Sequence, residues 1–442
     1  MDEIVLLIEW LAWRLPKEIL SRQAINLKKM FGALKGNARP LMLYNIFWSI
    51  PNSFLGIYLQ LFMVEQGISK IEIGTIASAQ LVAQMAGAFM GGFLAERMGR
   101  LRTITLVDGL CWPLAYLFFS TAHGYLGFLA GAVLVGFIST LGPAWTSLYV
   151  EGSPASKRMY LFGLLQTSWF AGGMIASLSG FLVYRWGVTT TCRGVFALAS
   201  VLTVFSLWAR ARHLKETTPP RRPFRISLSD VKALFRGHIY TLKALASRRR
   251  MAIVLGIQIL TAAFIVVSGT YSNLYIADPK GLNIPAASLA AFPLVSGAIV
   301  LLSTVALVPL ITLSGLFGFL LLGVAFMAMS NAIYVLAPAG AFGMVVVGVV
   351  AGGAGFAIFN PSLNGYWSNL MDDRERPRIL SFTSVIAMLV TMPVPTIAGA
   401  LYTIRPSLPI VMILCIHATI AACILWVASI KEKPRTPAKA PA

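Results

Sequence analysis

A short charged turn lies between two long apolar stretches and decides how the fold is interpreted. Its sequence is Gly92-Phe93-Leu94-Ala95-Glu96-Arg97-Met98-Gly99-Arg100-Leu101-Arg102. The stretches on either side, 72–95 and 103–121, are each close to the 20 or so mostly apolar residues that a helix needs to cross a bilayer. The turn is therefore interpreted as a connection between two membrane-spanning helices.

The composition of the whole chain agrees with a membrane protein. The 442 residues have a mean hydropathy of +0.77, and charged residues make up 12% of them, against roughly 25% in soluble domains. A soluble fold of this size would expose much apolar surface to water, so that class is excluded, as are collagen, coiled coils and disordered chains. The apolar runs are continuous rather than alternating, which favours helices over a β-barrel.

The apolar runs give twelve candidate spans. The sequence therefore predicts an all-α polytopic membrane protein. The spans are 41–64, 72–95, 103–121, 124–149, 160–184, 194–209, 251–276, 286–308, 315–337, 341–369, 379–403 and 408–430.

The basic residues are distributed unevenly between the two sides of this topology. With the N-terminus inside, 31 of the 36 Lys and Arg residues fall on the inner side and 5 on the outer side. Basic residues near span ends favour the cytoplasm, so we predict a multi-pass protein of the cell membrane with both termini cytoplasmic. On this count no Lys or Arg remains for the membrane core. The net charge of +20 then reflects topology, and without a nucleic-acid motif we expect no nucleic-acid partner.

A basic segment divides the chain into two halves of six spans. The halves echo each other, because Pro143 precedes Arg158 by the same spacing at which Pro361 precedes Arg376. Such repetition is typical of duplicated transporters, although chance similarity between apolar helices is the alternative. The predicted organisation is a cytoplasmic N-terminal amphipathic segment (1–39), a six-helix bundle (40–209), a basic cytoplasmic loop (210–250), a second six-helix bundle (251–430) and a cytoplasmic tail (431–442).

The turn at 92–102 closely resembles the signature of the major facilitator superfamily (MFS), G-x-L-a-D-r-x-G-r-r/k. It departs from that pattern by Glu96 in place of Asp and by the inserted Leu101. Glu151 and Arg158 also resemble the turn between spans 4 and 5 of that family. The resemblance covers about residues 40–430, and it implies the MFS fold and transport by alternating access.

The same resemblance implies a gating latch on the inner face. The acid of the signature would contact the start of span 11, and its basic residues would reach Glu151. The latch would be assembled when the protein faces outward and broken when it opens inward; a purely topological charge cluster is the alternative. The residues assigned to it are Gly92, Glu96, Arg97, Gly99, Arg100, Glu151, Arg158 and Arg378.

Two features depart from the family pattern. The matching turn of the second half, 309–314, has no charge, so the second half lacks a repeat of the latch. Residues 124–149 contain no Arg, so the arginine motif of proton antiporters is missing. The resemblance therefore does not imply drug/proton antiport.

Polar and aromatic residues in the middle of the spans are the candidates for a solute site. Amides and aromatic rings can hydrogen-bond to and stack on a neutral solute, although for each single residue helix packing is the competing role. The predicted substrate-binding residues are Asn45, Trp48, Asn52, Gln80, Gln84, Trp145, Gln166, Trp169, Gln258, Tyr271, Asn360, Asn364 and Trp367.

Charge sets the predicted class of solute. Without a basic side chain at mid-membrane, phosphates, nitrate and dicarboxylates are disfavoured, which leaves small neutral, amphipathic or weakly cationic solutes. Asp108 is the acid well inside a span. An intramembrane acid is a candidate for proton coupling, and a structural ion pair with Arg100 or Arg102 is the alternative.

The sequence therefore predicts secondary-active or facilitative transport of a small-molecule solute. A non-transporting receptor or lipid-handling protein on the same fold is the alternative. An enzyme is not expected, because the four His residues are scattered and no acidic pair or metal-ligand cluster is present. The predicted partners are the solute, membrane lipids and, through Asp108, protons. We expect a monomer without a cofactor or metal.

Overall fold

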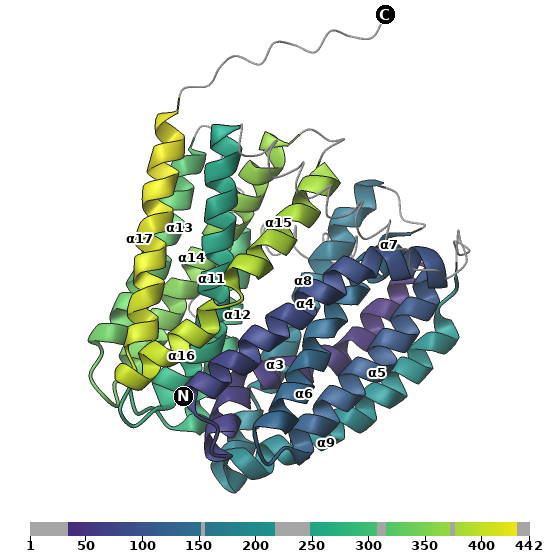
Figure 1. Ribbon diagram of the computed structural model, residues 1–442, viewed down its shortest axis with the longest axis horizontal. Coiled ribbons are helices and arrows are strands. Elements are labelled where there is room, and N and C mark those ends of the chain that lie inside the picture. Colours follow the sequence, from purple (N-terminus) through teal and green to yellow (C-terminus); the bar gives the residue numbers. More distant parts are fainter. Residues whose placement is uncertain (1–33, 152–154, 217–247, 307–314, 372–375, 431–442) are drawn as a thin grey trace, which may run out of the picture.

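The computed structural model describes residues 34–151, 155–216, 248–306, 315–371 and 376–430, and the regular secondary structure in these ranges consists of helices. Almost all of the predicted amphipathic segment, most of the basic loop, the turn at 309–314 and the C-terminal tail lie outside the described residues. The described helices form two bundles of six crossings each (Figure 1).

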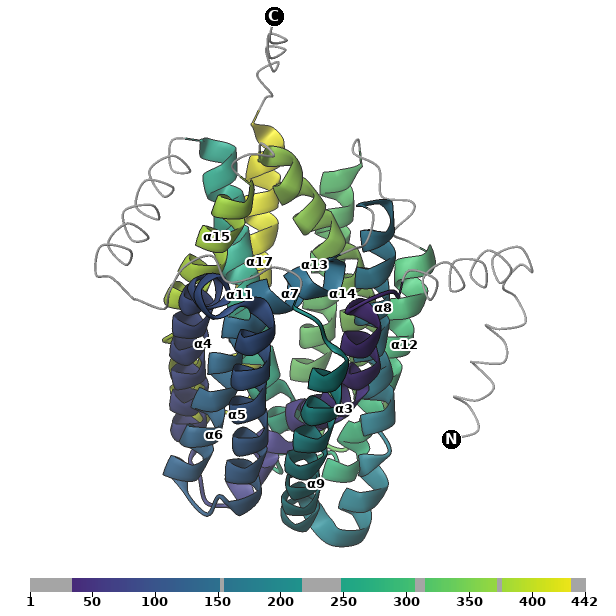
Figure 2. The same ribbon diagram turned by 90° about the vertical axis from the view of Figure 1, so that its right-hand side faces the viewer.

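The first bundle contains the helices before the basic loop. Its fourth crossing is divided, because Pro143 stands in the first turn of α7 and cannot donate a hydrogen bond to the preceding turn. Figure 2 shows α4, α5, α6 and α9 of this bundle side by side. The elements are α3 (Ala38–Glu65), α4 (Lys70–Met98), α5 (Arg100–Thr121), α6 (Tyr125–Phe137), η1 (Ile138–Leu141), α7 (Gly142–Val150), α8 (Ala155–Ala176) and α9 (Ser179–His213).

The second bundle contains the helices after the loop. Its fifth crossing is broken between α15 and α16, because Pro393 lies between the two helices and Pro395 lies in the first turn of α16. The elements are α11 (Arg249–Ala277), η2 (Ala286–Ala290), α12 (Ala291–Ala306), α13 (Leu316–Leu336), α14 (Phe342–Leu370), α15 (Arg376–Thr391), α16 (Val394–Ile404) and α17 (Leu408–Ser429).

Most of the expected spans have a matching helix. Among the described residues, 11 segments are long and apolar enough to cross a membrane. The remaining crossing of the predicted twelve, 160–184, corresponds to α8 together with the first turns of α9.

The sixth span is longer than the sequence predicts. It was expected at 194–209, but the backbone turns at Gly187, whose φ is 76°, and the helix then continues to His213. The charged Arg193 lies within the helix, because its guanidinium donates to the carbonyl oxygens of Ser120 and Ala122 at 3.3 and 3.0 Å. A satisfied guanidinium is tolerated near the end of a membrane helix.

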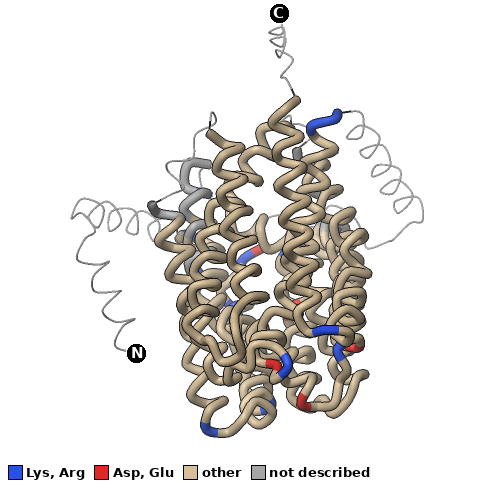
Figure 3. The backbone as a smooth tube through the Cα atoms, turned by 90° about the vertical axis from the view of Figure 1, so that its left-hand side faces the viewer, with Lys and Arg blue, Asp and Glu red and all other residues tan. Residues whose placement is uncertain are grey.

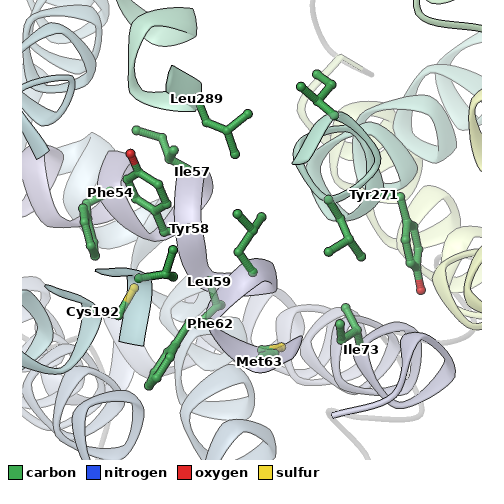
Figure 4. Packing of buried hydrophobic residues seen from close by; sticks show 14 of the residues in the cluster. Phe54, Ile57, Tyr58, Leu59, Phe62, Met63, Ile73, Cys192, Tyr271 and Leu289 are labelled. Carbon is green, nitrogen blue, oxygen red and sulfur yellow. The ribbon is translucent and has the colours of Figure 1, made fainter. Parts of the chain in front are cut away.

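The two bundles meet at one end and separate toward the other. We call the end where α3 and α11 begin and where α9 and α17 end the terminus face, and the other end the opposite face. One hydrophobic cluster joins the bundles toward the opposite face and contains residues of α3, α9, α11, η2 and α16. Figure 4 shows part of it, with Tyr58 of α3 near Leu289 of η2 and with Ile73 of α4 on the side of Tyr271 of α11.

Toward the terminus face each bundle has a core of its own. The second bundle packs around Val254, Leu320 and Ile424, and the first around Leu41 and Leu148. No described residue is common to these two clusters, so within the described part of the chain each bundle has a separate apolar core at this end.

The outer surface of the bundles is apolar. Leu198, Val201 and Phe205 on α9 are each more than half exposed, as expected of side chains that contact lipid. Figure 3 shows the described helices free of charged residues over most of their length. The fold is thus an all-α polytopic membrane protein.

Candidate functional site

A cavity of about 450 Å³ lies within the first bundle. Its walls come from α3, α4, α5, α6, η1, α7, α8 and α9, and none of the described residues of the second bundle lines it. The cavity is therefore built between the helices of one half.

Seven of the thirteen predicted substrate-binding residues line this cavity. They come from four separate crossings of the first bundle. The seven are Asn45, Trp48, Asn52, Gln80, Gln84, Trp145 and Trp169.

The amides in the cavity wall differ in what they already bind. Asn45 Nδ2 donates to Ser168 Oγ at 2.8 Å, so it joins α3 to α8. For the side chains of Asn52, Gln80 and Gln84, no hydrogen bond to another described residue is present. These three amides have donors and acceptors available to a molecule in the cavity.

Indole rings form the apolar part of the wall. Trp48 contacts Trp112 and Trp169 edge to face, at centroid distances of 5.6 and 6.2 Å. Trp112 in turn stacks on Tyr116 at 5.4 Å. Trp145 stacks on Tyr149 at 4.8 Å on the α7 side. The rings support one another and present flat apolar surfaces next to the free amides.

A buried ion pair completes the cavity wall and corrects the expectation that no basic residue lies in the core. Arg210 Nη2 lies 2.5 Å from Asp108 Oδ2, and both residues line the cavity. Asp108 is 5% exposed and Arg210 is 9% exposed. The sequence pattern assigned Arg210 to the basic loop because the sixth span was placed too short. The partner of Asp108 is therefore Arg210, and the suggested pairs with Arg100 or Arg102 are wrong.

The predicted residues of the second bundle are located elsewhere. Asn364 Nδ2 donates to Asn360 Oδ1 at 3.0 Å, and Gln258 Nε2 lies 3.5 Å from Asn364 Oδ1, so these amides form a chain between α11 and α14. Tyr271 and Trp367 are 0% and 2% exposed, and neither lines the cavity. In this conformation both are packing residues.

The remaining predicted substrate-binding residue, Gln166, has a side chain outside the described part. The same holds for the latch residues Glu96 and Arg378 and for the surroundings of Gly92. The structure places the backbones of these four residues in α4, α8 and α15 and leaves their predicted roles untested.

One contact of the predicted latch is present at the terminus face. Arg100 Nη1 lies 3.1 Å from Glu151 Oε2, and the two side chains are 29% and 27% exposed. Gly99, with a φ of 86°, caps α4 and lets the chain turn directly into α5. Arg97 is partly buried and Arg158 is exposed. The described latch contact lies within the first bundle.

A second feature near this turn was not predicted. Glu216 Oε2 accepts a hydrogen bond from the backbone N–H of Leu101 at 2.8 Å. Asn37 forms two hydrogen bonds with the backbone of Lys215, at 2.8 and 2.9 Å. The beginning of the basic loop is thus fixed to the first bundle, and a carboxylate stabilises the positive N-terminus of α5.

Polar contacts join the two bundles toward the opposite face. Lys70 Nζ of α4 lies 3.8 Å from Asp278 Oδ2, just past α11. The same Asp278 oxygen accepts a hydrogen bond from the Tyr402 hydroxyl at 2.8 Å. Ser78 and Thr396 contribute a hydroxyl–hydroxyl bond of 2.9 Å between α4 and α16.

The backbones of α4 and α16 cross closely at this place. A Cβ on Gly74 would lie 2.7 Å from the Tyr271 hydroxyl, and a Cβ on Gly399 would lie 2.6 Å from the carbonyl oxygen of Lys70. Both positions therefore require glycine for the bundles to close.

Arg210 and Trp112 line the cavity but were not among the predicted site residues. A signal for Arg210 was available, because an acid inside a span calls for a counter-ion, and Arg210 stands at the end of the neighbouring crossing. Trp112 follows Asp108 by four residues and therefore lies on the same face of α5.

Comparison with known proteins identifies the family. A model of the Major Facilitator Superfamily matches residues 41–331. The niacin transporter NiaP of Acinetobacter baylyi is 28% identical over 167 residues, which are 37% of this chain and 37% of that protein. The minor myo-inositol transporter IolF of Bacillus subtilis is 26% identical over 149 residues, 33% of each chain. The matched part thus spans well under half of the length of these relatives.

Solved structures of low sequence identity have the same fold. The nucleoside transporter NupG aligns with a TM-score of 0.66 at 13% identity, over 90% of this chain and 100% of that one. A POT family transporter in complex with a thioalcohol conjugated peptide aligns with a TM-score of 0.70 at 14% identity, over 88% and 96% of the two chains. The two six-helix bundles, the signature turn and the family match lead to one assignment: the chain belongs to the Major Facilitator Superfamily.

Proposed function

We propose that the protein moves a small neutral, amphipathic or weakly cationic solute across the cell membrane by alternating access. The observation that carries this proposal is the asymmetry of the bundle interface. One apolar cluster and a set of polar contacts hold the bundles together toward the opposite face, whereas separate cores stand at the terminus face. A solute cavity beside an interface closed at one end is the arrangement that alternating access needs.

The basic residues orient this arrangement in the membrane. Because 31 of the 36 Lys and Arg residues fall on the side of the termini in the predicted topology, we propose that the terminus face is cytoplasmic. The conformation described then opens inward. The contact between Arg100 and Glu151 is retained in it, so we propose that opening breaks the contact between Glu96 and the start of α15. The pair of Arg100 and Glu151 would then act on the rate by holding the turn that contains Glu96.

The cavity wall supports the class of solute. The ion pair of Asp108 and Arg210 has no net charge, and the rest of the wall offers indoles and free amides. A dicarboxylate or a phosphate would bring two or more charges into a wall that balances none of them. We therefore propose a compact solute that has a flat apolar part, polar edges and no large net charge.

The names of the relatives supply a panel for the test. They are named as transporters of niacin, cis,cis-muconate and myo-inositol. The purified protein is screened for thermal stabilisation by nicotinamide, nicotinate, myo-inositol and cis,cis-muconate, because a ligand that binds the native state raises its apparent stability. We expect the uncharged members to stabilise the protein more than the dicarboxylate.

Uptake into proteoliposomes decides between transport and the alternative, a receptor or lipid-handling protein. A transporter accumulates or equilibrates a solute that stabilises it, at a rate that saturates with solute concentration. A solute that binds and never enters the vesicles would favour the receptor. Repeating the uptake with an imposed pH gradient shows whether protons are coupled to transport.

A further inference from the structure

The ion pair of Asp108 and Arg210 is an unusual element of a cavity wall. Asp108 comes from α5 and Arg210 from α9, and both are more than nine-tenths buried. Removing two charges from water is costly, and a buried pair is often no more stabilising than apolar side chains of the same size. Stability is therefore a weak reason for this pair, and its place in the solute cavity indicates recognition.

The pair uses a small part of its hydrogen-bonding capacity. An ionised carboxylate accepts about four hydrogen bonds and a guanidinium donates five. Among the described residues, each of the two groups makes one side-chain hydrogen bond, and it is the bond between Arg210 Nη2 and Asp108 Oδ2. Both groups reach the cavity surface, so further donors and acceptors are available to a solute.

Two more polar atoms in the same wall lack a partner. Thr203 Oγ1 and Trp48 Nε1 are buried and have no hydrogen-bond partner among the described residues, and both residues line the cavity. Thr203 is 3% exposed and lies two helical turns before Arg210 on α9. A buried polar group without a partner costs free energy. Such groups beside an incompletely bonded ion pair indicate that a polar ligand completes this wall.

The charge balance selects the class of ligand. A solute with one negative charge would bind Arg210 and leave Asp108 without compensation, and a cation would do the reverse. With an uncharged solute, Asp108 and Arg210 remain paired with each other. A zwitterion replaces each partner by a group of the same sign, so that both buried charges remain paired.

We propose that Asp108 and Arg210 recognise a zwitterionic solute, with its carboxylate on Arg210, its ammonium group on Asp108 and a flat ring against Trp48 and Trp112. This inference rests on the proposed transport function and narrows its solute to one that is neutral through balanced charges. Trp112 stands on the same face of α5 as Asp108. The ring centroids of Trp48 and Trp112 are 5.6 Å apart. The charged end and the ring of one small molecule can therefore contact both parts of the wall.

Two matched sets of probes test the charge signature. The indole set contains L-tryptophan, indole-3-propionate, tryptamine and tryptophol, which are the zwitterion, anion, cation and uncharged form of one skeleton. The phenyl set contains L-phenylalanine, 3-phenylpropionate, phenethylamine and 2-phenylethanol. In thermal-shift titrations of the full chain, we expect the zwitterion of at least one set to bind about tenfold more tightly than each of its three analogues. No preference for the zwitterion in either set would overturn the proposal.

Variants of the pair link the preference to these two side chains. The double variant Asp108→Asn/Arg210→Gln keeps a hydrogen-bonded pair without charge, and we expect it to lose the zwitterion preference and to bind the uncharged analogue within about twofold of wild type. Asp108→Asn alone shifts the preference toward the anion, and Arg210→Gln alone toward the cation. If a single variant fails to fold because it buries an unpaired charge, the double variant still decides.

Arg212→Gln is the matched control. Arg212 lies two residues further on α9, is exposed, and stacks on Trp208 with 3.6 Å between the guanidinium carbon and the ring centroid. We expect this variant to keep the wild-type preference. A double variant of the pair that keeps the preference overturns the proposal. The proposal is also overturned if the wild-type protein prefers the anion and takes up the anion only with a pH gradient.

The outcome separates this proposal from the proposed function. Uptake of an uncharged solute without any zwitterion preference would contradict the recognition site alone. A zwitterion preference that depends on Asp108 and Arg210, without uptake of any probe into proteoliposomes, would support the recognition site and contradict the transport function.

Discussion

The Tyr271 hydroxyl of the second bundle lies 3.0 Å from the carbonyl oxygen of Lys70 in the first bundle, to which it donates a hydrogen bond. The same hydroxyl lies 3.0 Å from the carbonyl oxygen of Pro395. Tyr271 is fully buried, and its ring centroid is 5.7 Å from that of Tyr402. This residue, which the sequence assigned to the solute site, instead joins α11, α16 and α4 where the bundles are closed.

Removing this hydroxyl is predicted to weaken the closed side. Tyr271→Phe keeps the ring and loses a hydrogen bond between the bundles, which is worth about 1 kcal/mol, or about fivefold in the ratio of two conformations. We expect the population to move away from the conformation described. Spin labels at Arg102 and Arg249, exposed residues at the terminus-face ends of α5 and α11, report the distance between the bundles in a variant without the four native cysteines.

Tyr275→Phe is the control for that experiment. The Tyr275 hydroxyl donates to the carbonyl oxygen of Tyr334 at 3.2 Å, within the second bundle. Its loss is expected to lower thermal stability without changing the distance distribution. Equal distributions for Tyr271→Phe and wild type would contradict the role assigned to Tyr271.

The crossing of α4 and α16 is predicted to tolerate no side chain. In Gly399→Ala the new methyl group would meet the Lys70 carbonyl oxygen at 2.6 Å and the Cα of Ile71 at 3.1 Å, and such overpacking costs about 1–3 kcal/mol. We expect uptake to fall by about tenfold or more, with normal insertion into the membrane. Gly256→Ala in α11, where the new carbon would have no described atom of another helix within 4 Å, should retain uptake; a similar loss in both variants would contradict the argument.

The unpartnered hydroxyl of Thr203 allows a test of ligand binding that leaves the fold intact. Thr203→Val removes a buried oxygen that has no partner among the described residues, so the stability of the ligand-free protein should stay the same or rise. Affinity for a transported polar solute should fall about fivefold, the value of one neutral hydrogen bond. A drop in ligand-free melting temperature with unchanged affinity would show that Thr203 acts in packing instead.

The ion pair at the terminus face is predicted to act on rate and hardly on stability. Arg100 and Glu151 are partly exposed, and such pairs contribute about 0–1 kcal/mol. Glu151→Gln should leave the amount of inserted protein and its melting temperature close to wild type and change the uptake rate, and Glu96→Gln should do the same. The swap Arg100→Glu/Glu151→Arg should restore the rate if the pair matters. Unchanged uptake in both single variants would remove the latch from the account.

The sequence predicted the fold well because lipid leaves few alternatives. Long apolar runs must become helices, and the basic residues order those helices across the membrane. The break in the fifth crossing of the second bundle lies at Pro393 and Pro395, because proline cannot donate the hydrogen bond that a continuous helix needs. The predicted sixth span was too short, because Arg193 is charged and its hydrogen-bond acceptors are distant in the sequence. These acceptors are the carbonyl oxygens of Ser120 and Ala122, at the end of α5.

The site was harder to predict, because the same residue types line a cavity and pack helices. Asn45, Trp48 and Asn52 are spaced so that they share one face of α3, and that face lines the cavity. The same reasoning could not place Tyr271 and Trp367, whose burial depends on neighbouring helices. Arg210 was assigned to the basic loop because the predicted sixth span ended one residue before it. The ion pair that determines the electrostatics of the cavity was therefore not predicted.

The most direct test of alternating access is a reversible cross-link across the closed side. Ser78 and Thr396 face each other from α4 and α16, with 2.9 Å between their hydroxyl oxygens, so Ser78→Cys/Thr396→Cys in a variant without the native cysteines is well placed for a disulfide. The measurement is the uptake, by oxidised and reduced protein in proteoliposomes, of the panel solute that wild type takes up best. Alternating access predicts that oxidation abolishes uptake, that a reductant restores it and that the oxidised protein still binds the solute. Uptake by the cross-linked protein at the rate of the reduced protein would contradict it.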